Sequence, residues 1–168
     1  MSPQVAAVVA KHTKRLLSLA ATGVLAFTAS AHAHRMPEAY VLLESSSVNG
    51  EAITGVTVRI LAEDALVIAV EAFGDSASLG QEHVQYVLLE RARKALPVKA
   101  GTLKPLGMEL DGEFAFLYFE GAAGAELSTA RVLSSVYESW TNYVRDQRGD
   151  EATTQMFTQR GPMQDHQH

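Results

Sequence analysis

The sequence predicts an α+β domain in which an antiparallel β-sheet carries a two-helix insertion after its first hairpin. Two turn dipeptides, Asn49-Gly50 and Asp111-Gly112, each lie between β-prone runs. Because these residue types tolerate positive φ, both dipeptides predict β-hairpins. Between the two hairpins the apolar residues recur at helical spacing. The predicted order is therefore strand, strand, two helices and then further strands, which is the order of an α+β fold.

The helical insertion is predicted in two parts. Residues 62–73 are rich in Ala, Leu, Glu and Asp and predict a short helix. Ser78 and Gln81 have the spacing of a capping box, which predicts a second, amphipathic helix running to about Leu96. Pro97 ends this helix, because proline cannot continue the helical hydrogen bonding.

The runs on either side of the two turns are predicted to be strands. The run that follows Asp111-Gly112 is apolar at nearly every position, which predicts a central strand covered on both faces. Phe116, Leu117 and Phe119 are therefore expected to be buried. Together the predicted strands are residues 40–46, 53–61, 103–110, 113–120, 127–137, 143–148 and 153–159.

Length and composition exclude several classes of protein. A chain of 168 residues with 47% hydrophobic residues predicts one domain with a substantial core. The absence of cysteine excludes disulfides, thiol catalysis, iron–sulfur clusters and cysteine-ligated zinc. A formal net charge of −5 argues against a nucleic-acid-binding protein, since phosphate contacts require clustered Lys and Arg.

The N-terminal segment is typical of a secretory signal peptide. Basic residues between positions 11 and 15 precede a short apolar run, residues 16–27. Two overlapping small-x-small sites follow, ending at Ala31 and Ala33, and either fits signal-peptidase cleavage. The alternative is an uncleaved membrane anchor, which the shortness of the apolar run disfavours.

Cleavage after Ala33 predicts a mature chain that begins at His34. It removes three basic and no acidic residues, so the net charge becomes −8, which disfavours adhesion to anionic lipid. The expected organisation is a signal peptide (1–33), a single α+β domain (34–160) and a flexible polar tail (161–168). The expected location is the periplasm, with no membrane insertion after cleavage.

Histidines at both ends of the mature chain are candidate metal ligands. The α-amine and imidazole of an N-terminal His34 could chelate copper, and His83 is the one other histidine within the domain. In the tail, His166 and His168 lie near two methionines and Asp165, which suits copper or zinc. Either cluster makes a periplasmic Cu/Zn-binding protein the alternative function.

Trp140, Tyr143 and Arg145 form the candidate interaction surface, because aromatic and arginine side chains dominate binding hot spots. The sequence contains no Gly-x-Ser-x-Gly elbow, no glycine-rich phosphate loop and no dinucleotide-binding fingerprint. The expected function is therefore a small exported binding or accessory protein for another envelope protein. A hydrolase with a site built from dispersed residues stays open as a further alternative.

Several short segments together resemble a family of small secreted bacterial proteins, a domain of unknown function often called orphan proteins. Members often carry a His-x-x-x-x-His-Asp pattern around the second strand, where this chain has Arg59, Glu63 and Asp64. The resemblance implies the fold and export, and it implies no activity and no metal site at those positions. It extends over about residues 34–160 and depends on the motifs His32-Ala33-His34-Arg35, Asn49-Gly50, Arg59-Ile60-Leu61-Ala62-Glu63-Asp64-Ala65, Asp111-Gly112-Glu113-Phe114 and Trp140-Thr141-Asn142-Tyr143-Val144.

Export makes a direct prediction about the N-terminus of the mature protein. Intact-mass measurement of the protein recovered from the periplasm should give a chain beginning at His34, or at His32 if the upstream site is cleaved. A mature chain that retains residues 1–31 would contradict export by this signal.

Overall fold

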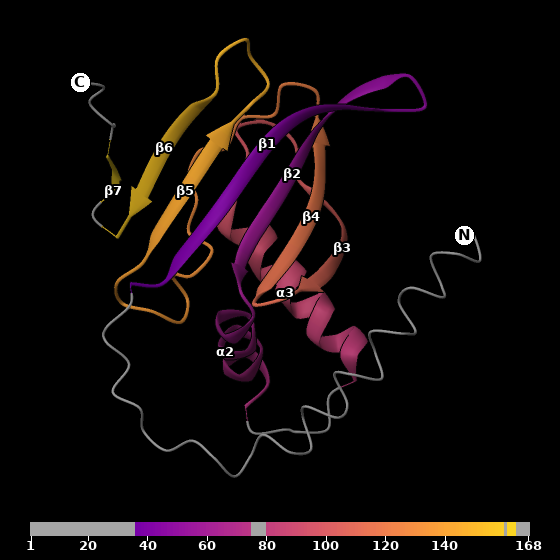
Figure 1. The fold of residues 1–168 in the computed structure, drawn as a ribbon. Coiled ribbons are helices and arrows are strands. Elements are labelled where there is room, and N and C mark those ends of the chain that lie inside the picture. The colour runs from indigo at the N-terminus through magenta and orange to yellow at the C-terminus, as the bar shows by residue number, and fades with distance from the viewer. Residues whose placement is uncertain (1–35, 75–79, 160, 164–168) are drawn as a thin grey trace. The chain divides into compact units, whose positions relative to one another are not determined.

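The computed structural model describes residues 36–74, 80–159 and 161–163, which form one sheet with two helices (Figure 1). The seven strands of this sheet lie in the order β3-β4-β2-β1-β5-β6-β7. The elements are β1 (Glu38–Val48), β2 (Glu51–Leu61), α2 (Ala62–Phe73), α3 (Gln81–Ala95), β3 (Lys104–Asp111), β4 (Phe114–Ala122), β5 (Thr141–Asp146), β6 (Thr153–Thr158) and β7 (Gly161–Met163).

The α+β class and the helical insertion after the first hairpin are confirmed, but the sheet is mixed and not antiparallel as predicted. β1 and β5 run parallel, with Glu38 opposite Thr141 and Leu43 opposite Asp146. All the other pairs are antiparallel. This parallel pair joins strands almost a hundred residues apart in the chain, and no local turn signal encodes such a pairing.

The two predicted hairpin turns are confirmed. At the first turn Asn49 and Gly50 have φ values of 53° and 84°, and Gly112 at the second turn has a φ of 57°. These positive φ values suit Gly and Asn and strain most other residues. The first turn aligns β1 and β2 over nine residue pairs, from Tyr40–Arg59 to Val48–Glu51.

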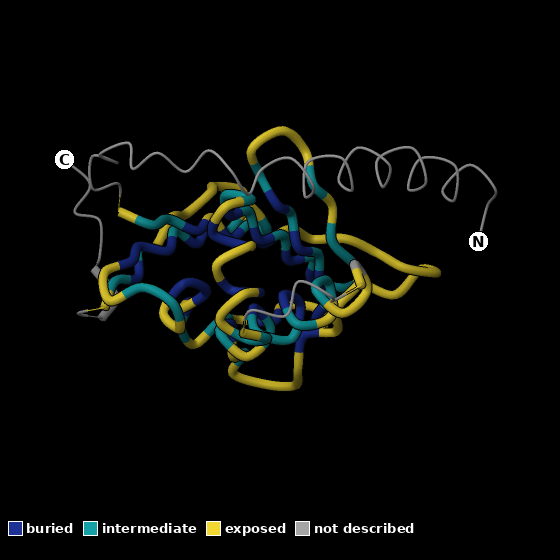
Figure 2. Tube along the Cα trace, turned by 90° about the horizontal axis from the view of Figure 1, so that it is seen from below, coloured by how far each residue is buried: buried dark blue, intermediate teal, exposed yellow. Residues whose placement is uncertain are grey.

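Both helices lie on one face of the sheet, which we call the inner face. Figure 2 shows buried stretches in the strands and in the segments packed against them.

α2 begins at Ala62 as predicted. The N-cap of α3 is Gly80, so the predicted cap at Ser78, which lies outside the described residues, is wrong. Among the described residues no helix is long and apolar enough to cross a membrane. Core residues of the strands and helices include Val41, Val58, Ile60, Ile68, Leu88, Ala92, Leu117 and Phe119.

Residues 127–137 were predicted to form a strand and instead make turns beneath the inner face. Val132 and Leu133 are buried there, and Leu127 and Val136 are partly buried against the core. The Tyr137 hydroxyl donates a 2.7 Å hydrogen bond to the carboxylate of Asp64, which is buried in the first turn of α2. An apolar run that fills space under a sheet has the same composition as a buried strand, which explains the error.

The end of the described chain adds a strand where the sequence suggested a tail. Residues Gly161–Met163 form β7, which pairs with β6. Residues 164–168 lie outside the described residues. The sheet therefore extends two strands beyond β5 on this side.

β4 is buried on one face only, which corrects the prediction of a strand covered on both sides. Leu117 and Phe119 are each 1% exposed on the inner face. Phe116 is half-buried and points to the opposite face, which we call the outer face. The outer face is apolar along β4 even though neither α2 nor α3 covers it, so alternation alone could not separate the two sides.

The two faces of β4 predict different costs for truncating neighbouring residues. Leu117→Ala should lower the free energy of unfolding by about 2–5 kcal/mol, because it leaves a cavity in the core. Phe116→Ala should cost clearly less, because its ring is partly solvated. Urea unfolding of both variants measures the difference, and equal losses would contradict this assignment of faces.

Candidate binding face

The outer face carries a row of aromatic and charged side chains that cross five strands. Strand alternation places them on one side, and the register brings Arg59 opposite both Tyr40 and Phe116, with Tyr143 on the far side of Tyr40. Tyr118 and Glu109 continue the row toward β3. The aromatic members of this outer face are Tyr40, Phe114, Phe116, Tyr118 and Tyr143.

A continuous stack forms at the centre of this face. The Tyr143 and Tyr40 rings stack with their centroids 5.1 Å apart. The Arg59 guanidinium carbon lies 4.4 Å from the Tyr40 centroid and 4.9 Å from the Phe114 centroid. Phe116 meets Phe114 edge-on at 6.4 Å. Cation–π attraction to the Tyr40 and Phe114 rings therefore holds the Arg59 guanidinium against the outer face of the sheet.

Two tyrosine hydroxyls of this face donate hydrogen bonds to carboxylates. Tyr40 donates a 2.9 Å hydrogen bond to Glu38, and Tyr118 donates a 3.2 Å hydrogen bond to Glu109. The hydrogen bond to Glu38 and burial raise the pKa of Tyr40, while burial and the charge of Glu109 raise the pKa of Tyr118. Both hydroxyls therefore stay protonated as donors at neutral pH.

Arg59 has no such partner. Its Nε–H is buried and donates no hydrogen bond to any described residue. The guanidinium also takes no part in the ion pairs formed among the described residues. Burying a cationic N–H without a hydrogen-bond acceptor costs free energy, and an acceptor that binds it removes that cost. The Arg59 guanidinium is therefore positioned by ring contacts, and its Nε–H has no hydrogen-bond acceptor among the described residues.

The candidate interaction residues are divided between the two layers of the structure. Tyr143 and Arg145 alternate onto the outer face, where Tyr143 ends the stack and Arg145 is exposed. Trp140 is 6% exposed and belongs to the core. The sequence reasoning missed Tyr40, Arg59 and Phe114, whose only sequence signal is alternation along strands that pair far from each other in the chain.

The candidate metal ligands are not brought together in the described part of the chain. His83 is exposed on α3, while His34, His166 and His168 lie outside the described residues. Among the residues that are described, no group of three or more His, Cys, Asp or Glu side chains is placed to hold a metal ion. The copper and zinc expectations therefore stay untested predictions.

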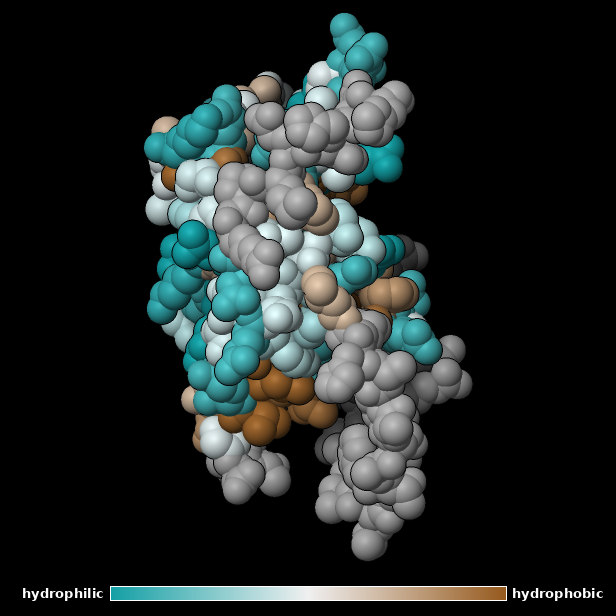
Figure 3. Space-filling model, turned by 90° about the vertical axis from the view of Figure 1, so that its left-hand side faces the viewer, coloured by the Kyte–Doolittle hydropathy of each residue, from teal (hydrophilic) through white to brown (hydrophobic). Residues whose placement is uncertain are grey.

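A second surface feature is an apolar patch on α2. Leu66, Val67 and Val70 are exposed on the side of the helix turned away from the core. Figure 3 shows hydrophobic residues gathered low on this side of the molecule, at the level of α2. The patch has no charged or hydrogen-bonding side chain among these three residues, so nothing in it selects a ligand chemistry.

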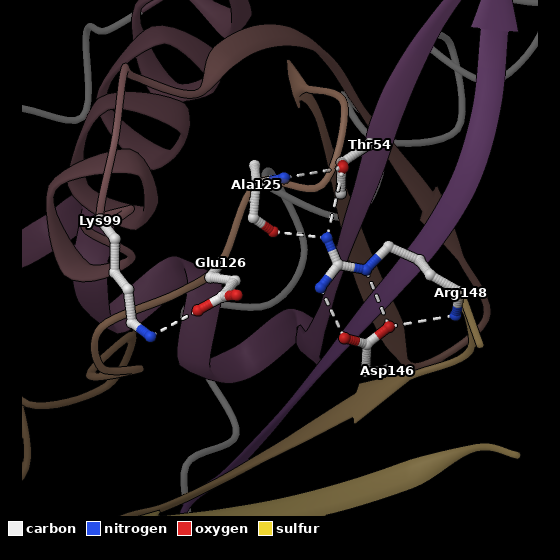
Figure 4. Close-up of polar contacts among 6 residues, drawn as sticks. All are labelled: Thr54, Lys99, Ala125, Glu126, Asp146 and Arg148. Atoms are coloured by element: carbon white, nitrogen blue, oxygen red, sulfur yellow. Dashed lines mark hydrogen bonds and ion pairs between the residues drawn. The ribbon is translucent and has the colours of Figure 1, made fainter.

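A third feature is a polar hollow at the end of the sheet where β1 and β5 finish. It has a volume of about 440 Å³. Arg148 closes it by a bidentate pair with Asp146, at 2.8 and 2.5 Å, and by a 2.5 Å bond to the Ala125 carbonyl (Figure 4). Thr54 Oγ1 accepts a further, 3.4 Å contact from Arg148 and a 3.2 Å bond from the Ala125 amide. The side chains lining the hollow are Ser45, Glu126, Asp146, Arg148, Glu151 and Thr153.

This network ties segments of the protein to one another. Hydrogen bonding to Arg148 lowers the pKa of Asp146, and the Lys99 ion pair lowers the pKa of Glu126. Both carboxylates are therefore ionised near neutral pH and unsuited to donating protons. Because Arg148 binds the chain's own carbonyl and carboxylate, it holds the loop after β4 against the end of β5.

Comparison with protein-family models, with curated proteins and with solved structures found no match to this chain. This outcome is consistent with the resemblance to orphan proteins of unknown function.

The Asp146–Arg148 pair predicts a specific pH dependence of stability. The folded pKa of Asp146 is depressed, so its contribution is full above the unfolded pKa of about 3.9 and is lost as the pH falls through the lower folded pKa. Asp146→Asn should lower stability at pH 7 and reduce the loss of stability on acidification below about pH 4. Urea unfolding at pH 7 and about pH 3 measures both effects.

Glu151→Gln is the matched control, because Glu151 lines the same hollow and forms no ion pair with the described residues. It should keep the stability of the unmodified protein at pH 7. Equal acid sensitivity of Asp146→Asn and the unmodified protein would contradict a structural role for the pair.

Proposed function

We propose that this chain is an exported binding or accessory protein of the bacterial periplasm that contacts another envelope protein through its outer face. The observation that carries the proposal is the Arg59 guanidinium, fixed between the Tyr40 and Phe114 rings and without an ion-pair partner among the described residues. Tyrosine and arginine are the residue types that most often supply binding energy at protein interfaces.

The shape of the face supports a protein partner. The row from Glu109 to Tyr143 follows the register of neighbouring strands, about 4.8 Å apart, and so forms a broad surface of side chains. Protein interfaces are broad and carry aromatic residues and arginine near their centres, whereas small-molecule sites are enclosed pockets. The hollow that Arg148 closes lies elsewhere, at the end of β5.

Site-specific photocrosslinking in the periplasm tests this proposal. A photoreactive residue at Thr57, which lies between Leu42 and Tyr118 on the outer face, should give a discrete crosslinked product. The same residue at Lys94, exposed on α3, should not give that product.

The crosslink should also depend on the aromatic stack. Tyr143→Ser removes the ring at one end of the stack and should reduce the yield at Thr57 without changing the amount of folded protein. Identical products at both positions, or no product at Thr57, would overturn the proposal.

A further inference from the structure

Arg59 is the cation at the centre of the outer face, where carboxylates lie on both sides of it; Arg145 lies farther out on β5, and Lys104 is paired with Glu120. Glu38, Glu109 and Asp111 share this face, and none of them forms an ion pair with a described residue. Glu38 and Glu109 instead accept hydrogen bonds from the hydroxyls of Tyr40 and Tyr118. The face therefore offers one oriented guanidinium with acidic neighbours on both sides.

The spacing of these charges follows from the sheet. Glu38 lies two residues from Tyr40, the cross-strand partner of Arg59, so its backbone is about 7–8 Å from that of Arg59. Glu109 lies two strands from Arg59, across Phe116, or about 10 Å. A complementary ligand presents an oxyanion with one cation about 7–8 Å to one side and another about 10 Å to the other.

This pattern selects among anionic ligands. Nucleic acids and anionic lipid surfaces carry many negative charges, which Glu38 and Glu109 would repel. A single carboxylate accepts two parallel N–H donors from a guanidinium, and flanking lysines or arginines on the same ligand neutralise the acidic neighbours. In an extended segment, residues two positions apart lie about 7 Å apart on one side, which is close to the distance from Arg59 to Glu38, and a long basic side chain can cover the greater distance to Glu109.

We propose that Arg59 receives one Asp or Glu carboxylate of a protein partner, presented between two basic residues that face Glu38 and Glu109. The proposal rests on the proposed function and names the partner chemistry of the same face. Tyr40 and Phe114 hold the guanidinium by cation–π contacts, and because its Nε is buried, the carboxylate would bind the two terminal Nη groups.

Two synthetic peptides test the inference on the mature protein. The first is the capped peptide Gly-Lys-Gly-Asp-Gly-Lys-Gly, and the second has Asn in place of Asp. Because the mature protein is acidic, non-specific attraction favours the Asn peptide, which has one more positive charge. The inference predicts the opposite order, with the Asp peptide binding about tenfold more tightly. NMR titration that follows the Arg59 Nε–H signal gives both the affinity and the site.

Two variants that each remove one positive charge separate the effect of the guanidinium from that of net charge. Arg59→Gln should abolish the preference for the Asp peptide and leave the Asn peptide bound at least as tightly as before. Lys94→Gln removes the same charge from an exposed position on α3, away from the outer face, and should retain the preference. Circular dichroism checks that both variants are folded, and if Arg59→Gln is not, Arg59→Lys replaces it, since Lys keeps the charge without the bidentate fork.

The result that overturns the inference is tighter or equal binding of the Asn peptide, an unchanged preference in Arg59→Gln, or no detectable binding of either peptide at millimolar concentration. The proposed function fails separately, when Thr57 gives no specific crosslink. A crosslink at Thr57 that is insensitive to Arg59→Gln would remove the carboxylate chemistry and keep the binding face.

Discussion

The pairing of β1 with β2 is the constraint on which the rest of the structure depends. This nine-pair ladder occupies the centre of the sheet, and β4 and β5 add to its two sides. The same register that places Val41 beside Val58 on the inner face places Tyr40 beside Arg59 on the outer face. A slip of one residue would exchange the faces, burying the guanidinium and exposing the valines. The turn at Asn49-Gly50 therefore sets both the core and the candidate binding face.

Local chemistry accounts for what the sequence predicts correctly. The hairpin dipeptides, the start of α2 and the stop at Pro97 each depend on residues close together in the chain, so their signals can be read directly. The parallel pairing of β1 with β5 depends on residues a hundred positions apart. Residues 127–137 were misread for a related reason, because composition records that they are buried and does not record what they pack against.

The candidate site is harder to predict than the fold. Tyr143 and Arg145 were identified by residue type, but Trp140, chosen on the same ground, is buried in the core. Arg59 has no local signal at all, because its significance comes from the ring of Tyr40 on one neighbouring strand and of Phe114 on the other. Such a constellation exists only once the register is known.

Arg59 and Arg148 show how the surroundings of one residue type decide its role. The Arg148 guanidinium donates along its edges to Asp146 and to the Ala125 carbonyl, so its hydrogen-bonding capacity holds the fold together. The Arg59 guanidinium instead packs against the Tyr40 and Phe114 rings, and no described residue accepts a hydrogen bond from its buried Nε–H. Aromatic packing supplies orientation without consuming donors. That difference makes Arg148 a structural residue and supports the proposed place of Arg59 at the centre of a binding surface.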